Sequence, residues 1–110
     1  MEVTIKGKTY QFKVTSWWGP LYLFEDIMDV AHHPENKFNM SLSFHLHVMF
    51  YAVLMNDNES LDITLEEFLQ ELNDLELHTQ LRDYYIKRTE ILTRHSGSTE
   101  ESAEDTKKKD

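Results

Sequence analysis

The most constraining feature of the sequence is an apolar segment near its centre. Of residues 42–55, 11 of 14 are apolar, and a helix that is apolar on every side must pack on more than one side. We therefore expect a central helix with Ser41 as its N-cap, although residues 43–48 also alternate as a strand does. The longest uninterrupted apolar run, 48–55, has 8 residues, whereas a bilayer span needs about 20, so we expect no contact with a membrane.

The first residues predict a β-hairpin, because residues 2–15 alternate between apolar and polar around Gly7. A two-residue loop at Gly7 and Lys8 would be a type II′ turn. One face of the hairpin would then be apolar throughout, with the pairs Ile5 and Tyr10, Val3 and Phe12, and Met1 and Val14. Since an isolated hairpin is marginally stable, this face must lie on helices.

Helical spacing and turn signals divide the remainder of the chain. A first helix is expected from Pro20, which suits a first helical turn, to the turn at His32, His33 and Pro34. Thr64 begins a third helix. The apolar stripe over residues 77–92 predicts a fourth helix, unless the third helix continues through residues 73–74. The predicted class is α+β, mainly α: a hairpin packed on three to four helices in residues 1–95, followed by a disordered acidic tail, 96–110.

Charge is unevenly distributed along the chain. The formal net charge is −9, and residues 57–77 hold eight acids and no lysine or arginine. Proteins that bind nucleic acid without sequence preference need basic groups to displace counterions from the phosphates. Because this chain is strongly acidic, nucleic acid is not an expected partner. The acidic block is either a solvated helix face or a docking surface for a basic helix. With no cysteine and no visible signal peptide, we expect a soluble intracellular protein.

No motif of enzyme chemistry occurs in the sequence. The three glycines form no phosphate-binding loop, and there is no G-x-S-x-G elbow. Among the six histidines, His45 and His47 are two residues apart and point in different directions on a helix. We expect a protein that is not an enzyme and has neither a cofactor nor a metal.

One segment argues against the expectation that no metal binds, because it resembles a calcium-binding EF-hand loop. In residues 56–67, three weak candidate ligands, Asn58, Asp62 and Glu67, fall at positions three, seven and twelve of that loop. Position one is Asn56 in place of aspartate, and position six is Leu61 where the turn needs glycine. A polar turn followed by a capping box explains the same residues.

Two aromatic pairs are candidates for binding a partner: Trp17 with Trp18, and Tyr84 with Tyr85. Adjacent residues on a helix point in different directions, so one member of each pair can pack in the core. Aromatic side chains dominate interface energetics, so the outward members are candidate anchors for a partner.

Three segments carry a resemblance to a known family: VTIKGKTYQFK at 3–13, FYAVL at 50–54 and ITLEEFL at 63–69. In their order and spacing the chain resembles the tail assembly chaperones of long-tailed phages and prophages. In that family a strand, a glycine turn and a second strand precede a helical domain with an apolar helix, a polar gap and a capped short helix. The resemblance covers roughly residues 1–95.

The resemblance implies a small chaperone in the cytoplasm of the bacterial host. Such a chaperone coats the hydrophobic helices of the tape measure protein, helps to recruit tail tube subunits, and is absent from the mature virion. No catalytic residues come with the resemblance, and homo-oligomers remain open. The alternatives are a small acidic adaptor that binds a partner helix and, less favoured, a degenerate EF-hand-like calcium-binding module at 56–67.

Overall fold

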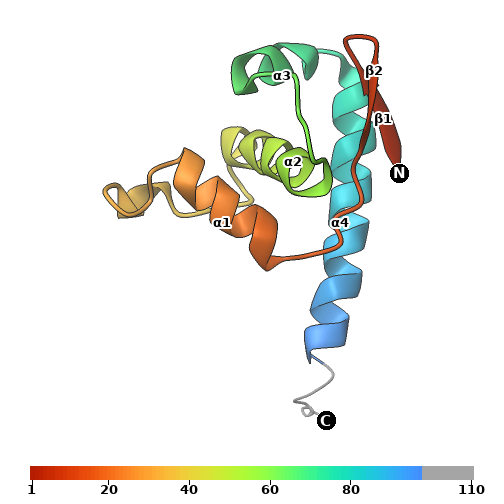
Figure 1. The fold of residues 1–110 in the computed structure, drawn as a ribbon. Coiled ribbons are helices and arrows are strands. Elements are labelled where there is room, and N and C mark those ends of the chain that lie inside the picture. Colours follow the sequence, from red (N-terminus) through yellow and green to blue (C-terminus); the bar gives the residue numbers. More distant parts are fainter. Residues whose placement is uncertain (98–110) are drawn as a thin grey trace.

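The computed structural model describes residues 1–97, with side chains as far as Arg94. A two-stranded antiparallel hairpin precedes four α-helices, which confirms the predicted class (Figure 1). The elements are β1 (Glu2–Ile5), β2 (Lys8–Gln11), α1 (Trp18–Ile27), the 3₁₀ turn η1 (Pro34–Asn36), α2 (Ser43–Asp57), α3 (Leu65–Glu71) and α4 (Leu75–Gly97). The predicted tail lies outside the described residues, apart from its first two positions, which end α4.

The hairpin turn lies one residue earlier than expected. Lys6 and Gly7 form the loop, with φ of 52° and 80°, so both central residues have the positive φ that a type I′ turn requires. The strands therefore pair Val3 with Tyr10 and Ile5 with Lys8, not Ile5 with Tyr10. The predicted pairing was wrong, because each β1 residue pairs with a β2 residue two positions earlier than expected. A shift by an even number of residues keeps every side chain on its expected face.

α2 is the central helix of the fold, as its apolar composition predicts. Figure 1 shows it surrounded by α1, α3 and α4. Eight of its residues are buried: His45, Leu46, Val48, Met49, Phe50, Ala52, Val53 and Leu54. Phe50 joins three elements of the core, because its ring meets Phe12 after β2 at 5.9 Å and Tyr85 of α4 at 5.6 Å.

The start of α2 differs from the prediction. Residues 43–48 are helical, so the strand alternative was wrong, and the N-cap is Leu42 without a side-chain hydrogen bond, so Ser41 is not the cap. Asn39 organises this turn instead. Its side chain accepts a hydrogen bond from the Ser41 N–H, and its own N–H donates to Nδ1 of the buried His45.

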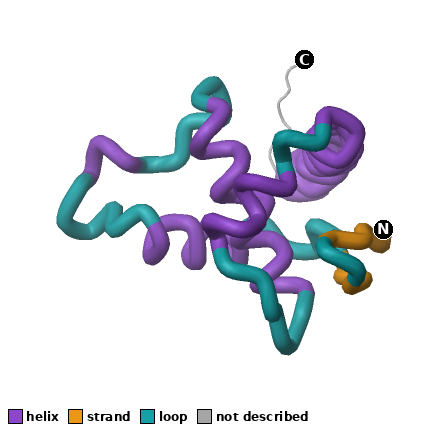
Figure 2. The backbone as a smooth tube through the Cα atoms, turned by 90° about the horizontal axis from the view of Figure 1, so that it is seen from above, coloured by secondary structure: helices purple, strands orange, loops and turns teal. Residues whose placement is uncertain are grey.

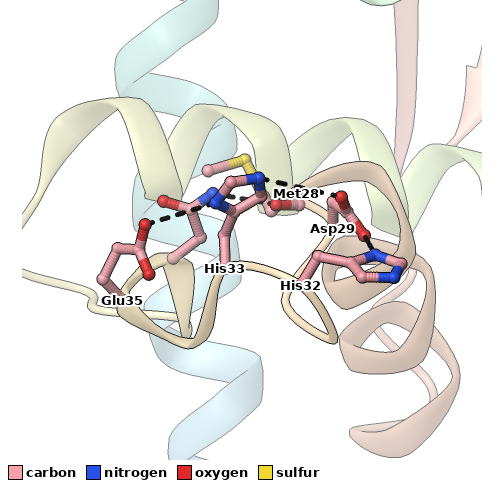
Figure 3. A network of polar contacts seen from close by, with 6 residues as sticks. Met28, Asp29, His32, His33 and Glu35 are labelled. Atoms are coloured by element: carbon pink, nitrogen blue, oxygen red, sulfur yellow. Dashed lines mark hydrogen bonds and ion pairs between the residues drawn. The ribbon is translucent and has the colours of Figure 1, made fainter.

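α1 begins at Trp18, two residues before Pro20, and ends at Ile27, well before the predicted turn at His32. Asp29 follows with φ 53°, in the left-handed region that commonly ends a helix. Its carboxylate accepts from the His32 ring at 2.8 Å, and His33 lies between Asp29 and Glu35 (Figure 3). The apolar spacing that extended the predicted helix could not show this polar turn.

α3 and α4 follow the sequence signals closely. Thr64 and Glu67 form both hydrogen bonds of the capping box, as predicted. The chain then turns at Asn73 and Asp74, and an Asp74 carboxylate oxygen accepts from the N–H of Glu76 at the start of α4. Residues 1–97 therefore contain four α-helices. Seen from above, α4 stands to one side of the other helices, beside the hairpin (Figure 2).

Within residues 1–97, no helix combines the length and the apolar character needed to cross a membrane. α4 has 23 residues but carries many charges, whereas the apolar α2 has 15.

Candidate partner-binding surface

Exposed aromatic rings cluster where the hairpin leads into α1. Trp17 is 39% exposed, Trp18 61% and Tyr22 64%. Trp18 and Tyr22 are four residues apart on α1, and their rings stack with centroids 6.1 Å apart and planes 29° apart. Single exposed apolar side chains are common on protein surfaces, but clusters of them are uncommon and mark interaction surfaces.

A glycine allows this aromatic segment to lie close to α2. A Cβ built on Gly19 would stand 2.3 Å from Oδ1 of Asn56, and the Gly19 N–H donates to Oγ of Ser16 at 3.2 Å. The junction therefore packs tightly against the end of α2. This close approach fixes the position from which Trp17 projects.

Trp17 forms one wall of a groove along α4. The groove has a volume of about 550 Å³, and its other walls come from Met40 and one side of the helix. The lining residues are Trp17, Met40, Ile86, Thr89, Glu90, Thr93 and Arg94. A smaller hollow of about 210 Å³ lies between the two tryptophans and the same part of α4. The spacing of the α4 residues gives the groove a straight floor parallel to the helix axis.

Both candidate tyrosines pack within the chain. Tyr85 is 2% exposed, and its burial raises the pKa of its hydroxyl to about 12. Tyr84 is half-buried, its ring lies 6.0 Å from Phe12, and its hydroxyl accepts a hydrogen bond from the Met1 amino group at 3.3 Å. Of the four predicted aromatic residues, the two tryptophans are therefore the ones that present exposed rings.

The end of α2 and the residue after it bind the last residue of β2 and the backbone that follows it. Asn58 donates to the Gln11 carbonyl at 2.9 Å and to a carbonyl in the last turn of α2 at 2.8 Å, and it accepts from the Gln11 N–H at 2.9 Å. One carboxylate oxygen of Asp57 accepts from the N–H groups of Lys13 and Val14 at 2.7 and 3.1 Å. Val14 has φ 51°, a strained value for a β-branched residue, so Asp57 holds the chain at a point of strain.

The other two calcium candidates face lysines of the hairpin. Asp62 binds Lys8, and this hydrogen bond lowers the pKa of the Asp62 carboxyl. Glu67 accepts from the Thr64 backbone, which lowers its pKa, and lies 3.6 Å from Lys6. Among residues 1–97, no three His, Cys, Asp or Glu side chains are grouped to hold a metal ion. In the structure, the three calcium candidates instead contact residues of the hairpin.

A second hollow, of about 340 Å³, separates β1 from the start of α4. Its lining includes four carboxylates and no lysine or arginine: Glu2, Glu71, Asp74 and Glu76, with Val3, Thr4, Leu77 and Gln80. Part of the acidic block predicted from the sequence thus gathers beside the hairpin.

Two histidines meet at the contact of α2 with α4. The rings of His47 and His78 lie edge to face, with centroids 4.9 Å apart. Nε2 of His47 is buried and has no hydrogen-bond partner in the described part of the chain. Burial, and then the charge of His78, lower the pKa of His47. The folded chain therefore favours the neutral form of His47.

We expect the folded state to lose stability as the pH falls from about 8 to about 5.5. Because the pKa of His47 is depressed below 6.5, the unfolded chain takes up this proton more readily. The contribution of His47 is thus complete above pH 6.5 and is lost as the pH falls through its folded-state pKa. Urea unfolding at both pH values measures the difference in the free energy of unfolding. The substitution His47→Leu should make this difference smaller. An equal difference in the two proteins would contradict this expectation.

Met40 and Ile86 were missed in the sequence. Ile86 had a signal, because it follows helical spacing with Thr89 and Thr93 but lies off the buried stripe. Met40 lies in a turn, and nothing local indicates that this turn reaches α4.

Comparison with known proteins gives no relative: no protein-family model, no curated protein and no solved structure matches the chain.

Proposed function

We propose that the protein is a non-enzymatic phage tail assembly chaperone that binds the tape measure protein and helps to recruit tail tube subunits. The groove beside Trp17 carries the proposal, because an apolar groove along a helix suits the apolar face of a partner helix. The identity of the partner comes from the family resemblance. In this proposal the chaperone acts in the host cytoplasm, leaves before the virion matures, and needs no metal or cofactor.

The composition of the groove supports binding to a helix. Trp17 and Met40 offer a ring and a flexible thioether, which adapt to apolar side chains of different shapes. Glu90 and Arg94 stand beside them and give the groove a charged border next to its apolar lining. The strongly acidic body would keep such a complex in solution.

The same groove also supports the second candidate, a helix-binding adaptor with no role in phage assembly. The groove does not distinguish the two candidates, since any amphipathic helix of suitable width would fit it. A calcium-binding module lacks comparable support, because Asn58, Asp62 and Glu67 all contact other groups.

Co-expression with the tape measure protein of the same genome tests the proposal. The chaperone should co-purify with that protein and increase the fraction that remains in solution. If neither result is seen, while another amphipathic helix binds the groove, the adaptor is favoured and the chaperone proposal is wrong.

Trp17→Ala is expected to weaken binding of the partner helix by about 10- to 100-fold, since buried aromatic anchors carry much of the energy of an interface. Isothermal titration calorimetry with a peptide from the tape measure protein measures the effect. Tyr22→Ala is the matched control, because Tyr22 is exposed but does not line the groove. Met40→Glu should weaken binding without removing a tryptophan. Equal affinity in all four proteins would exclude the groove.

A further inference from the structure

The outer face of α4 carries a regular row of charges. Asp83, Lys87, Glu90 and Arg94 are all exposed. Their spacing of four, three and four residues places them within a sector of about 60° on a helix with 3.6 residues per turn. The buried Leu81 and Tyr85 lie on the opposite side. We call these four residues the charge stripe.

The members of the charge stripe do not pair with one another. Their spacing would allow ion pairs within the helix, but Asp83 binds its neighbour Arg82 at 3.3 Å instead. Among the ion pairs of the described residues, none includes Lys87, Glu90 or Arg94. Three of the four charges are therefore available to another molecule.

The stripe is complementary to itself when a second helix runs in the opposite direction. Its signs read minus, plus, minus, plus, and its spacing is the same from either end. In an antiparallel pair centred between residues 88 and 89, Asp83 would face Arg94 of the second copy, and Lys87 would face Glu90. Two-fold symmetry would form each contact twice. A parallel pair in register would place like charges together.

We propose that the charge stripe binds a second copy of this chain, forming an antiparallel dimer through α4. The arrangement of the fold leaves this face open. Figure 2 shows α4 beside the other helices, and Figure 1 shows its last turns extending past them. The side of α4 that packs on the core points away from the charge stripe. In the dimer, the rest of each chain would therefore lie on the outer side of the helix pair.

The dimer would bring two copies of the groove onto one face. Ile86, Thr89 and Thr93 all lie on the same side of the stripe. The two-fold rotation between antiparallel helices keeps that side facing the same way in both copies. A dimer would thus present two grooves along one long surface, but dimerisation does not depend on what the grooves bind.

Analytical ultracentrifugation of the full chain tests the proposal. The wild-type protein should form dimers in a concentration-dependent manner at low ionic strength, and about 1 M NaCl should dissociate them, since salt screens exposed ion pairs. A wild-type chain that remains monomeric at low ionic strength at every concentration overturns the proposal.

Two double exchanges with the same composition and net charge provide the decisive comparison. Asp83→Lys with Lys87→Asp places like charges opposite one another at every contact and should weaken the dimer by at least about tenfold. Lys87→Glu with Glu90→Lys preserves complementarity at every contact and should retain the dimer. Circular dichroism verifies that both variants fold. Equal dissociation constants for the two variants overturn the proposal.

Binding of a partner is measured separately. A monomeric chain that uses the charge stripe to bind the tape measure protein would assign this face to that protein and overturn the dimer. A dimer that does not bind the tape measure protein would leave this inference intact and refute the proposed function.

Discussion

Phe50→Ala is expected to destabilise the fold by about 3–5 kcal/mol. Phe50 is completely buried, and its ring contacts both Phe12 and Tyr85, so truncation leaves a cavity where the hairpin, α2 and α4 meet. Since small domains are stable by only about 5–15 kcal/mol, this loss would bring the chain close to unfolding. The midpoint of urea unfolding, followed by circular dichroism, measures the change.

Phe44→Ala is the matched control for this substitution. Phe44 lies on the same helix but is 52% exposed, so its truncation should change the free energy of unfolding by less than about 0.5 kcal/mol. Similar losses in the two variants would show that α2 is not buried on the side described.

Asn58→Ala is expected to cost about 1–3 kcal/mol, the second largest effect. The substitution removes three hydrogen bonds at once, two to Gln11 and one to the last turn of α2. It leaves both the N–H and the carbonyl of Gln11 without a protein partner, and water can replace these contacts only in part because the site is half-buried. Hydrogen exchange should show faster exchange at the Gln11 amide.

Two further variants test the role of Asn58. Asn58→Asp keeps an acceptor for the Gln11 N–H but loses both donated bonds, so it should destabilise the chain as well. Glu59→Ala changes the exposed neighbour in the same loop and should have little effect. Wild-type stability in Asn58→Ala would mean that the loop does not hold the hairpin.

Local patterns predicted most of the elements. The capping box at Thr64 was predictable because short-range hydrogen bonds form it. The break at Asn73 and Asp74 was one of two alternatives left open, and the structure shows that it occurs. The central position of α2 followed from its composition alone. Each of these features depends on residues within a few positions of one another.

The errors arose where longer-range contacts or backbone conformation decide the outcome. Gly7 favours both a II′ turn and a I′ turn, and Lys6 had to adopt a positive φ for the second. α1 ends early because Asp29 adopts a left-handed conformation and Asn36 donates to the Met28 carbonyl at 2.9 Å. Apolar spacing contains neither kind of information.

The candidate site was only partly predictable for the same reason. The sequence offered one outward member of the pair Trp17 and Trp18 as an anchor and allowed the other to pack in the core, whereas the structure exposes both rings. The groove also needs Met40 and Ile86, which are distant in the sequence and meet only through the packing of α4.

The bonds from Asn58 to Gln11 also affect how copies of the chain can aggregate. A hairpin has two unpaired edges, each a template for another strand. On β2, the Asn58 amide occupies backbone groups that an incoming strand would need. On β1, strand addition between two copies would bring together two sets of carboxylates from Glu2, Glu71, Asp74 and Glu76. One edge is thus protected by a hydrogen-bonded side chain and the other by charge repulsion.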